Sequence, residues 1–351
     1  MELEEEKVEE FVQRFVTDLA AAAHAATVSV GHNLGLYKAL AEGGAQTSEE
    51  LATRTGCEPR LVEEWLSAQA ASDYCVYDSN GGLFSLTPEQ AFCLADASSP
   101  AYLAPVMGLA SALHKDEERV RNAFTGTSTF AWHEHQHELF DAMALSTEVD
   151  YLALVPEWIP ALEGVHEKLT SGARVADIGC GYGAPTIMLA EAYPRSVFSG
   201  FDYHPDSIDR ARKAAAAQGV SDRLTFEIAS GADFPGRDYD LICTFAALHD
   251  MGDPVTVARH IRGALKPDGT WLIVEQNAGD TVDDNRNPMG RLMYSVSTFI
   301  CVPNALSQGS ERPLGAAAGE KGLRAVAKEA GFSRWRRAGE TLFNLVLEAR
   351  P

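Results

Sequence analysis

Three glycines and an acid near the middle of the chain have the types and spacing of a loop that binds a ligand. Gly179, Gly181 and Gly183 follow an apolar run and lead into a helical stretch, and Asp177 precedes them. Glycine is required where a tight turn needs unusual backbone dihedral angles and where a ligand approaches the backbone closely. The spacing is G-x-G-x-G, which differs from the dinucleotide spacing G-x-G-x-x-G, and no Lys-Ser or Lys-Thr follows to form a phosphate loop.

A second acid, Asp202, lies nineteen residues beyond Gly183, at the end of the next apolar run. A carboxylate there can accept hydrogen bonds from both hydroxyls of a ribose, as in nucleotide-binding α/β folds. Asp177 would repel a pyrophosphate but attract the ammonium group of an amino acid. Together the two acids predict a nucleoside with a cationic amino-acid tail, a description that S-adenosylmethionine fits. The alternative is a structural strand-to-helix turn with a chance acid downstream.

His249 is the first candidate for a catalytic group. It follows an apolar run and is expected at the carboxyl edge of the predicted sheet, where doubly wound folds bind ligands. An oxygen or nitrogen acceptor that carries a proton needs a base that titrates near neutral pH, and a histidine at this edge could be that base. Alternatively, His249 caps the end of the strand or packs beside the cofactor.

A run of alternate histidines follows Trp132, and in a helix His133 and His137 would align at i and i+4. We favour the interpretation that Trp132 and these histidines line a pocket for a small-molecule acceptor, or that they form a solvated helical face. A metal site is the less favoured alternative, because catalytic metal sites usually take their ligands from several elements. Tyr294, in the amphipathic stretch 291–300, could form a wall of the same pocket.

Apolar, β-rich runs alternate with helical stretches from residue 173 onward. This alternation is typical of βαβ units and predicts an α/β fold with a doubly wound, Rossmann-like, mostly parallel sheet. The predicted strands are 173–178, 197–201, 223–228, 239–245, 270–275, 332–338 and 341–349, and the predicted helices are 184–193, 205–218, 254–265 and 319–330.

The N-terminal part has a different pattern, that of a winged helix. Residues 4–41 are helical in pattern, Thr47 and Glu50 fit a capping box, and a helix ending at Gly56 precedes one at 59–71. Two short strand-like runs, 74–77 and 83–86, flank a turn cluster. We therefore expect a winged-helix domain over 1–100, a helical linker and pocket wall over 101–165, and a cofactor-binding domain over 166–351 with a lid insertion at 277–318.

The charge of the chain argues against nucleic acid as a partner. It contains 29 Lys and Arg against 50 Asp and Glu, a net charge of −21. Nucleic-acid binding depends on Lys and Arg that neutralise phosphates, and an anionic membrane surface is disfavoured for the same reason. Residues 47–87 have two basic and seven acidic residues, and the predicted recognition helix carries Glu63 and Glu64. A dimerisation or pocket-capping module is therefore favoured over a DNA reader.

Compartment and solubility are predicted from three simpler features. No apolar run is long enough to span a membrane, and the first ten residues, with six Glu and one Lys, do not resemble a signal peptide. The six cysteines are scattered without a C-x-x-C pair, which predicts reduced thiols in a cytoplasm.

Several motifs together resemble those of a known family. Residues 177–183 with Asp202 are similar to motifs I and post-I of the class I S-adenosylmethionine-dependent methyltransferases, and residues 239–254 are similar to their motif IV. The winged-helix front end, residues 287–291 and the ending 343–350 resemble a group of bacterial small-molecule methyltransferases. More distantly, the chain is similar to plant-type O-methyltransferases with an N-terminal dimerisation domain, which implies a homodimer formed through that domain.

The resemblance also implies roles for individual residues. His249-Asp250 matches the catalytic His-Asp pair of those O-methyltransferases, and Glu275 matches the acid that orients this histidine, although Met251 stands where they usually have Trp. Ser230 stands where many relatives place an acid near the adenine. The residues expected to contact S-adenosylmethionine are Tyr151, Asp177, Gly179, Cys180, Gly181, Gly183, Asp202, Tyr203, Ser230, Gly231 and Phe245.

We therefore expect methyl transfer from S-adenosylmethionine to a small-molecule acceptor, with O-methylation favoured over N- or C-methylation. One alternative is a transcription regulator that uses the methyltransferase-like domain to sense a ligand, and another is a methyltransferase fold used for other chemistry. No metal site is expected. Some keto-acid C-methyltransferases bind iron at the position of His249-Asp250, but no matching third ligand is evident in the sequence near residue 301.

Overall fold

The computed structural model describes residues 3–99, 101–136, 139–140, 142–144 and 151–351, and these divide into two compact units. The N-terminal unit consists of Met1–Lys115 and Gln136–Val149, and the C-terminal unit consists of Asp116–His135 and Asp150–Pro351. The domain limits predicted at residues 100 and 165 stay predictions. Among the described residues, no helix combines the length and the apolar character that crossing a membrane requires.

The N-terminal unit is a winged helix preceded by a long helix. The stretch 4–41 is not one helix, because Gly35, with φ of +69°, separates α1 (Glu5–Asn33) from α2 (Leu36–Gly43). The predicted capping box of Thr47 and Glu50 begins α3 (Ser48–Thr55), and α4 (Pro59–Ala71) has the predicted bounds. Strands β1 (Val76–Asp78) and β2 (Leu83–Ser85) pair antiparallel as the wing, and α5 (Pro88–Leu94) and α6 (Gly108–Lys115) follow.

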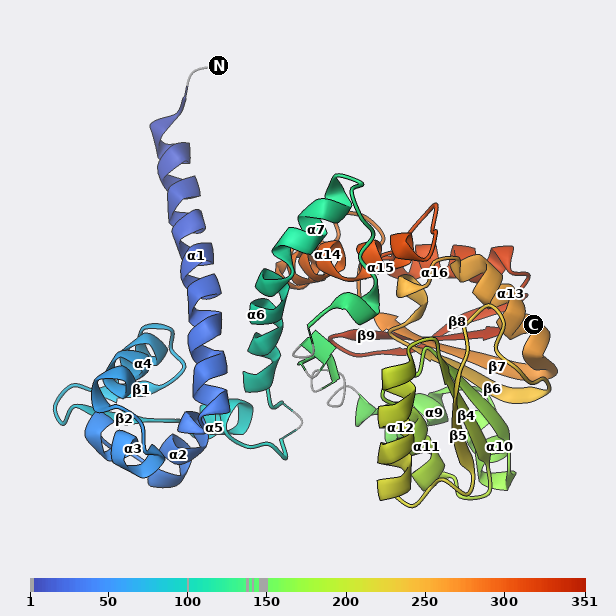
Figure 1. The fold of residues 1–351 in the computed structure, drawn as a ribbon, viewed down its shortest axis with the longest axis horizontal. Coiled ribbons are helices and arrows are strands. Elements are labelled where there is room, and N and C mark those ends of the chain that lie inside the picture. Colours follow the sequence, from blue (N-terminus) through green and yellow to red (C-terminus); the bar gives the residue numbers. More distant parts are fainter. Residues whose placement is uncertain (1–2, 100, 137–138, 141, 145–150) are drawn as a thin grey trace. The chain divides into compact units, whose positions relative to one another are not determined.

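A small apolar core holds this unit together. Leu40, Leu51 and Leu66, from α2, α3 and α4, are fully buried within it, and Trp65 packs beside them. By contrast, α1 exposes large apolar side chains along its first half: Val8, Phe11, Val12, Phe15, Val16 and Leu19. Figure 1 shows α1, in dark blue, extending well beyond the other helices of its own unit.

The C-terminal unit is built on a seven-stranded sheet with the order β5-β4-β3-β6-β7-β9-β8. The strands are β3 (Arg174–Ile178), β4 (Val197–Asp202), β5 (Leu224–Ile228), β6 (Tyr239–Phe245), β7 (Leu265–Gln276), β8 (Arg334–Glu340) and β9 (Asn344–Arg350). All are parallel except β9, which runs antiparallel to both of its neighbours. The predicted α/β, doubly wound architecture is therefore confirmed, and β7 begins earlier than predicted because Leu265 pairs with Tyr239 across a bulge.

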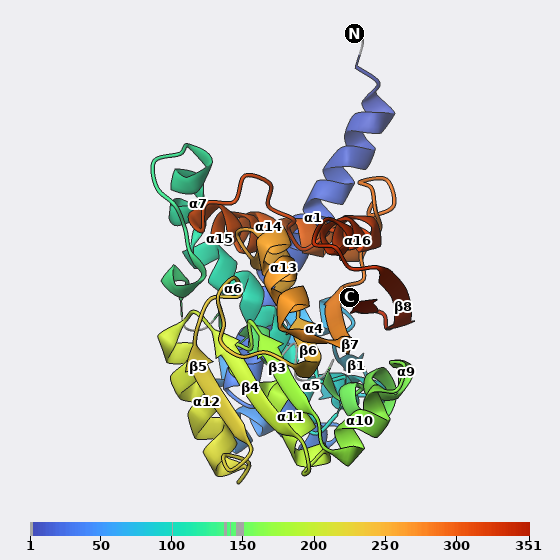
Figure 2. The same cartoon turned by 90° about the vertical axis from the view of Figure 1, so that its right-hand side faces the viewer.

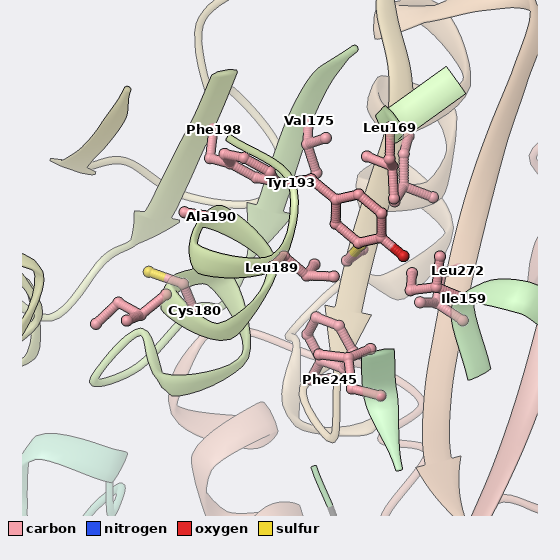
Figure 3. Packing of buried hydrophobic residues seen from close by; sticks show 14 of the residues in the cluster. Ile159, Leu169, Val175, Cys180, Leu189, Ala190, Tyr193, Phe198, Phe245 and Leu272 are labelled. Carbon is pink, nitrogen blue, oxygen red and sulfur yellow. The ribbon is translucent and has the colours of Figure 1, made fainter. Parts of the chain in front are cut away.

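Helices cover both faces of this sheet (Figure 1). One face packs on α10 (Val165–Ser171), α11 (Ala184–Ala192) and α12 (Pro205–Ala217), and the other packs on α13 (Pro254–Ala264) and α16 (Gly319–Glu329). Figure 3 shows the first of these cores, in which Tyr193, Leu189 and Val175 meet between α11 and the strands. Because both faces are covered, the central strands β3 and β6 are buried and largely apolar, whereas the edge strands β5 and β8 carry exposed polar residues.

Shorter helices complete the C-terminal unit. Before the sheet these are α7 (Glu117–Phe124), the turns η2 (Trp132–Glu134) and η3 (Leu154–Trp158), and α9 (Ile159–Ala161). The predicted lid region contains α14 (Pro288–Phe299) and α15 (Cys301–Ser307), so its expected amphipathic helix is present. Figures 1 and 2 both draw α7 beside α15, although the two helices are far apart in the sequence.

Candidate active site

The glycine loop joins β3 to α11 at the carboxyl edge of the sheet. Gly179, Gly181 and Gly183 all have positive φ, between +52° and +80°. A Cβ on Gly183 would lie 2.3 Å from the ring of Phe226 on β5, so packing of the loop against this ring excludes any side chain there. A Cβ on Gly181 would meet nothing within 4 Å, so at that position the loop presents its backbone to open space. This is the arrangement that close approach of a ligand to the backbone requires.

Asp177 lies beneath the loop and is almost completely buried. One of its oxygens accepts a hydrogen bond of 2.5 Å from the Thr186 hydroxyl, while Oδ1 has no hydrogen-bond partner among the described residues. Burial raises the pKa of Asp177 to about 7, against the smaller opposing effect of the Thr186 hydrogen bond. A buried carboxylate oxygen without a partner is costly, and a ligand with an ammonium group would satisfy it.

Asp202 at the end of β4 is held in a fixed orientation by two backbone groups. The amides of Gly181 and His204 each donate to one of its carboxylate oxygens, both over 2.9 Å. Each oxygen keeps a second lone pair, and the side chain is only partly exposed. Burial raises the pKa of Asp202, although these two backbone hydrogen bonds oppose the rise. The Asp202 carboxylate could accept hydrogen bonds from the ribose of a nucleoside, the unpartnered Asp177 oxygen could bind its cationic tail, and the open backbone at Gly181 leaves room between them.

The other predicted cofactor residues lie around this edge. Phe245 is buried at the end of β6 and packs edge-to-face on Tyr151, with ring centroids 5.5 Å apart, and Cys180 is buried in the glycine loop. Ser230 follows β5, where its hydroxyl accepts from the amide of Ala232. A Cβ on Gly231 would lie 3.2 Å from Ile178 and from Val257, which makes this glycine a close-packing position.

His249 lies in the turn η4 (Leu248–Asp250) immediately after β6 and is 3% exposed. Its Nδ1 is 2.5 Å from a carboxylate oxygen of Glu275, which ends β7, and its backbone amide donates to the other oxygen of Glu275 over 3.3 Å. Burial alone would lower the pKa of His249, but the carboxylates of Asp250 and Glu275 together raise it well above its ordinary value. Glu275 thus fixes the ring and stabilises its protonated form.

Two further side chains lie at Nε2 of His249. Asp250 Oδ1 is 3.3 Å away, and Cys301 at the start of α15 brings its sulfur close to both. The three potential ligand atoms lie within 4.8 Å of one another. The sequence showed no matching third ligand near residue 301, and the structure places the Cys301 thiol beside the pair; the expectation of no metal site stays a prediction.

Asn304, one turn after Cys301, connects three segments at this edge and was missed by the sequence analysis. Its side-chain oxygen accepts hydrogen bonds from the amide of Trp132 over 3.0 Å and from the hydroxyl of Tyr203 over 3.2 Å. Its side-chain nitrogen donates to the backbone oxygen of Asp250 over 3.2 Å. One buried amide thus fixes the predicted acceptor segment, the loop after Asp202 and the turn that carries His249 relative to one another.

A second buried His-carboxylate pair was also missed. His135 Nδ1 is 2.7 Å from the Asp116 carboxylate, and its Nε2 has no hydrogen-bond partner among the described residues. Burial lowers the pKa of His135, with Asp116 opposing, and Asp250 lies within electrostatic range of its ring. Nothing in the local sequence identifies this pair, because α7, an irregular stretch and η2 separate its members.

The remaining predicted pocket residues are distributed over this unit. His133 is exposed and stacks on His204, with ring centroids 6.2 Å apart, in a cavity of about 410 Å³ that Tyr203 also lines. Tyr294 is 37% exposed on α14, and its hydroxyl accepts from the side-chain amide of Asn285. His137 lies outside the described residues.

Family models match two segments of the chain. Residues 169–321 match a methyltransferase domain, and residues 22–96 match an Rv2258c-like winged helix-turn-helix domain. The sequence is 34% identical over 125 residues to 27-O-demethylrifamycin SV methyltransferase of Amycolatopsis mediterranei, covering 34% of this chain and 46% of the relative. Methyltransferase GfsG of Streptomyces halstedii is 29% identical over 126 residues, which cover 35% of this chain and 45% of the relative. The match thus spans less than half the length of these curated relatives.

Solved structures share the fold over nearly the whole chain. Mitomycin 7-O-methyltransferase MmcR superposes with a TM-score of 0.70 at 20% identity, covering 98% of this chain and 99% of that one. Human N-acetylserotonin methyltransferase, solved in complex with S-adenosylmethionine, superposes with a TM-score of 0.67 at 18% identity, and the superposition covers 97% of each chain. The resemblance to class I methyltransferases is confirmed: the chain carries a methyltransferase domain behind a winged helix-turn-helix domain.

Proposed function

We propose that this protein is an S-adenosylmethionine-dependent methyltransferase that acts on the hydroxyl group of a small molecule. The observation that carries the proposal is the arrangement of Asp202, Asp177 and the glycine loop around one open stretch of backbone. The matching methyltransferase domain and the named relatives support the cofactor and the reaction class. When bound, the cofactor would supply a methyl group on a positively charged sulfur, an electrophile that needs no further activation.

The protein's own task is then to position an acceptor and to remove its proton. In-line displacement requires the acceptor atom about 3 Å from the methyl carbon and opposite the sulfur, so positioning contributes much of the acceleration. We assign to Nε2 of His249 the role of taking the proton from the hydroxyl group of the acceptor. Because Glu275 holds Nδ1, the neutral ring presents the lone pair of Nε2 to the acceptor, and both neighbouring carboxylates stabilise the imidazolium that forms when the proton is taken. The raised pKa means that only the fraction of the protein with a neutral ring acts as the base, so turnover should rise with pH.

The experiment that tests this function uses the purified full chain with S-adenosylmethionine and a panel of phenol and alcohol acceptors. Formation of S-adenosylhomocysteine together with a methylated product supports the proposal, and its absence for every acceptor contradicts it. His249→Ala should lower kcat by about 100-fold or more while leaving S-adenosylhomocysteine binding unchanged. His114→Ala is the matched control, because that histidine is exposed on α6 and, among the described residues, its ring is hydrogen-bonded to a carbonyl of the same helix.

We also propose that the winged unit serves dimerisation rather than DNA reading. In α4, the recognition-helix position, Arg60 is paired with both Glu63 and Glu64, so its charge is compensated. The exposed apolar stripe on α1, defined by Val8, Phe11, Val12, Phe15, Val16 and Leu19, would be covered by a second copy of the chain. The six free cysteines are consistent with a cytoplasmic location.

Light scattering coupled to size exclusion tests the dimer. The double variant Phe11→Glu and Phe15→Glu should elute as a monomer, because it places charges in the stripe, whereas Gln13→Ala on the polar side of α1 should remain a dimer. A monomeric wild type would contradict the assignment. A salt-dependent gel shift with promoter DNA would instead favour the regulator.

A further inference from the structure

We propose that the buried pair of His135 and Asp116 selects the acceptor, because Nε2 of His135 accepts a hydrogen bond from a second hydroxyl or amino group of that molecule. The substrate class is then an arene with two hydrogen-bond donors, one to be methylated and one to be recognised. The inference rests on the proposed function in placing the acceptor beside His249. It adds a specificity-determining residue to which the methyl transfer itself gives no role.

The ring of His135 is held in place before any ligand binds. Its Nδ1 lies 2.7 Å from a carboxylate oxygen of Asp116, and both side chains are completely buried. The ring also packs against Phe130 and Trp132, with ring centroids 4.2 and 6.0 Å away. A hydrogen bond to a buried carboxylate and aromatic packing together fix the direction in which Nε2 points.

The remaining ring nitrogen of His135 is a hydrogen-bond acceptor. A carboxylate only accepts, so Nδ1 carries the ring proton toward Asp116 and Nε2 carries the lone pair. Burial lowers the pKa of His135, and the opposing effect of Asp116 is smaller, so the ring stays neutral near pH 7. Nε2 is itself buried and has no hydrogen-bond partner among the described residues. Such an atom is costly to leave unpaired, and a donor on a ligand would satisfy it.

The pair lies in the same compact unit as the proposed base, and a printed chain of contacts connects the two. Asn304 accepts from the amide of Trp132 and donates to the backbone oxygen of Asp250, which ties the segment that carries His135 to the turn after β6. The Asp250 carboxylate also acts electrostatically on the His135 ring. An acceptor beside His249 can therefore extend to a second, fixed polar contact.

The groups around His135 decide which substituent fits there. An ether or carbonyl oxygen would place its lone pairs against the lone pair of Nε2, and neither could donate. A carboxylate would in addition be repelled by Asp250; Asp116 is also an acid, although Arg119 at 4.0 Å offsets part of its charge. A hydroxyl or amino group avoids both costs. With two aromatic rings packed against this histidine, a dihydroxyarene or an aminohydroxyarene fits best.

Matched pairs of small phenols test this site. The full chain, with its histidines labelled with nitrogen-15 and saturated with S-adenosylhomocysteine, is titrated with each isomer of dihydroxybenzene and with the methylphenol in which a methyl group replaces one hydroxyl. The imidazole resonances are recorded, and those of His135 are assigned by their loss in His135→Gln. We expect at least one dihydroxybenzene to bind about tenfold or more tightly than its methylphenol and to shift the Nε2 resonance of His135.

Two substitutions separate recognition of the ligand from a purely structural role. His135→Gln keeps an acceptor oxygen near the position of Nε2, whereas His135→Asn reaches Asp116 but is too short for the ligand. The preference for the dihydroxybenzene should fall to about unity in His135→Asn and survive in part in His135→Gln. The opposite order would show that the residue only holds its own segment.

His260→Asn is the matched control. His260 is partly buried, its ring packs edge-to-face on Phe234 with centroids 4.4 Å apart, and its Nε2 bonds a backbone oxygen. It thus resembles His135 in its surroundings but lies on α13. This variant should keep the full preference of the wild type.

The outcomes distinguish this inference from the proposed function. Equal affinities within every pair, no binding of any dihydroxybenzene, or an Nε2 resonance of His135 that does not move overturns the role of His135, while methyl transfer is judged by its own product assay. A preference of the expected size in a protein that forms no methylated product contradicts the proposed function alone. Binding of S-adenosylhomocysteine by every variant is the check of folding.

Discussion

Replacing Asp202 by alanine should weaken S-adenosylhomocysteine binding by about two orders of magnitude. Both carboxylate oxygens already accept from the backbone amides of Gly181 and His204, so the carboxylate cannot rotate and its remaining lone pairs have fixed directions. Hydrogen bonds to a charged acceptor contribute about 1.5–3 kcal/mol each, and the lower value suits a partly exposed group. Two ribose hydroxyls then account for about 3 kcal/mol, or about 150-fold in Kd.

Isothermal titration calorimetry with S-adenosylhomocysteine measures this change directly. Asp202→Asn tests the charge at nearly constant shape: whichever backbone amide the new NH₂ group faces loses its acceptor, so this variant should bind more weakly too. Asp209→Ala on α12 is the control, because Asp209 is exposed and pairs only with Arg212 in the described structure. If both Asp202 variants bound like the wild type while remaining folded, the assignment of this carboxylate to the ribose would be refuted.

Three further predictions concern the same edge of the sheet. The pKa of Asp177 is raised to about 7, and an ammonium group favours the ionised form of this carboxyl. The affinity for S-adenosylhomocysteine should therefore rise from about pH 6 to about pH 8, and binding should release a proton. Calorimetry in two buffers of different ionisation enthalpy measures that proton, and the Asp177→Asn variant should release none. Gly183→Ala should lower the free energy of unfolding by about 1–3 kcal/mol in a denaturant titration. The loss should be larger than that of Gly181→Ala, because only a Cβ at residue 183 would lie against Phe226. Equal losses in the two variants would contradict this packing argument. Asn304→Ala removes the acceptor of the Trp132 amide and of the Tyr203 hydroxyl and one of the two donors to the Asp250 backbone oxygen, so it should cost about 1–3 kcal/mol and also lower kcat. Unchanged kcat would show that the residue only stabilises the fold.

The cofactor side of the site could be read from the sequence because its signals are local. Asp177 and the three glycines are consecutive members of one strand-turn-helix unit, and Asp202 ends the next strand of the same sheet. In a parallel sheet the carboxyl ends of neighbouring strands meet at one edge, so strand assignment alone brings these residues together. Alternation of apolar runs was sufficient for that assignment, since strands covered on both faces are apolar throughout.

His249 and Glu275 follow the same logic. His249 lies in the turn that follows β6, and Glu275 lies at the end of β7. Because β6 and β7 are neighbours in the sheet, the proximity of the two residues follows from the strand order. The strand order does not predict the direction in which each ring nitrogen of His249 points. It also does not predict which side chains lie beside Nε2. Those depend on the packing of α15.

The sequence by itself thus determined the two-part organisation, the sheet and the residues that end its strands. Only the tertiary structure decided what meets them from outside the sheet: Cys301 beside His249, Asn304 between three segments, and the buried pair of Asp116 and His135. The physical reason is that hydrophobic periodicity specifies which face of a helix is buried but not which strand edge it covers or at what height. That choice is made by packing between segments far apart in the chain, and it places the polar atoms that decide the chemistry of the site.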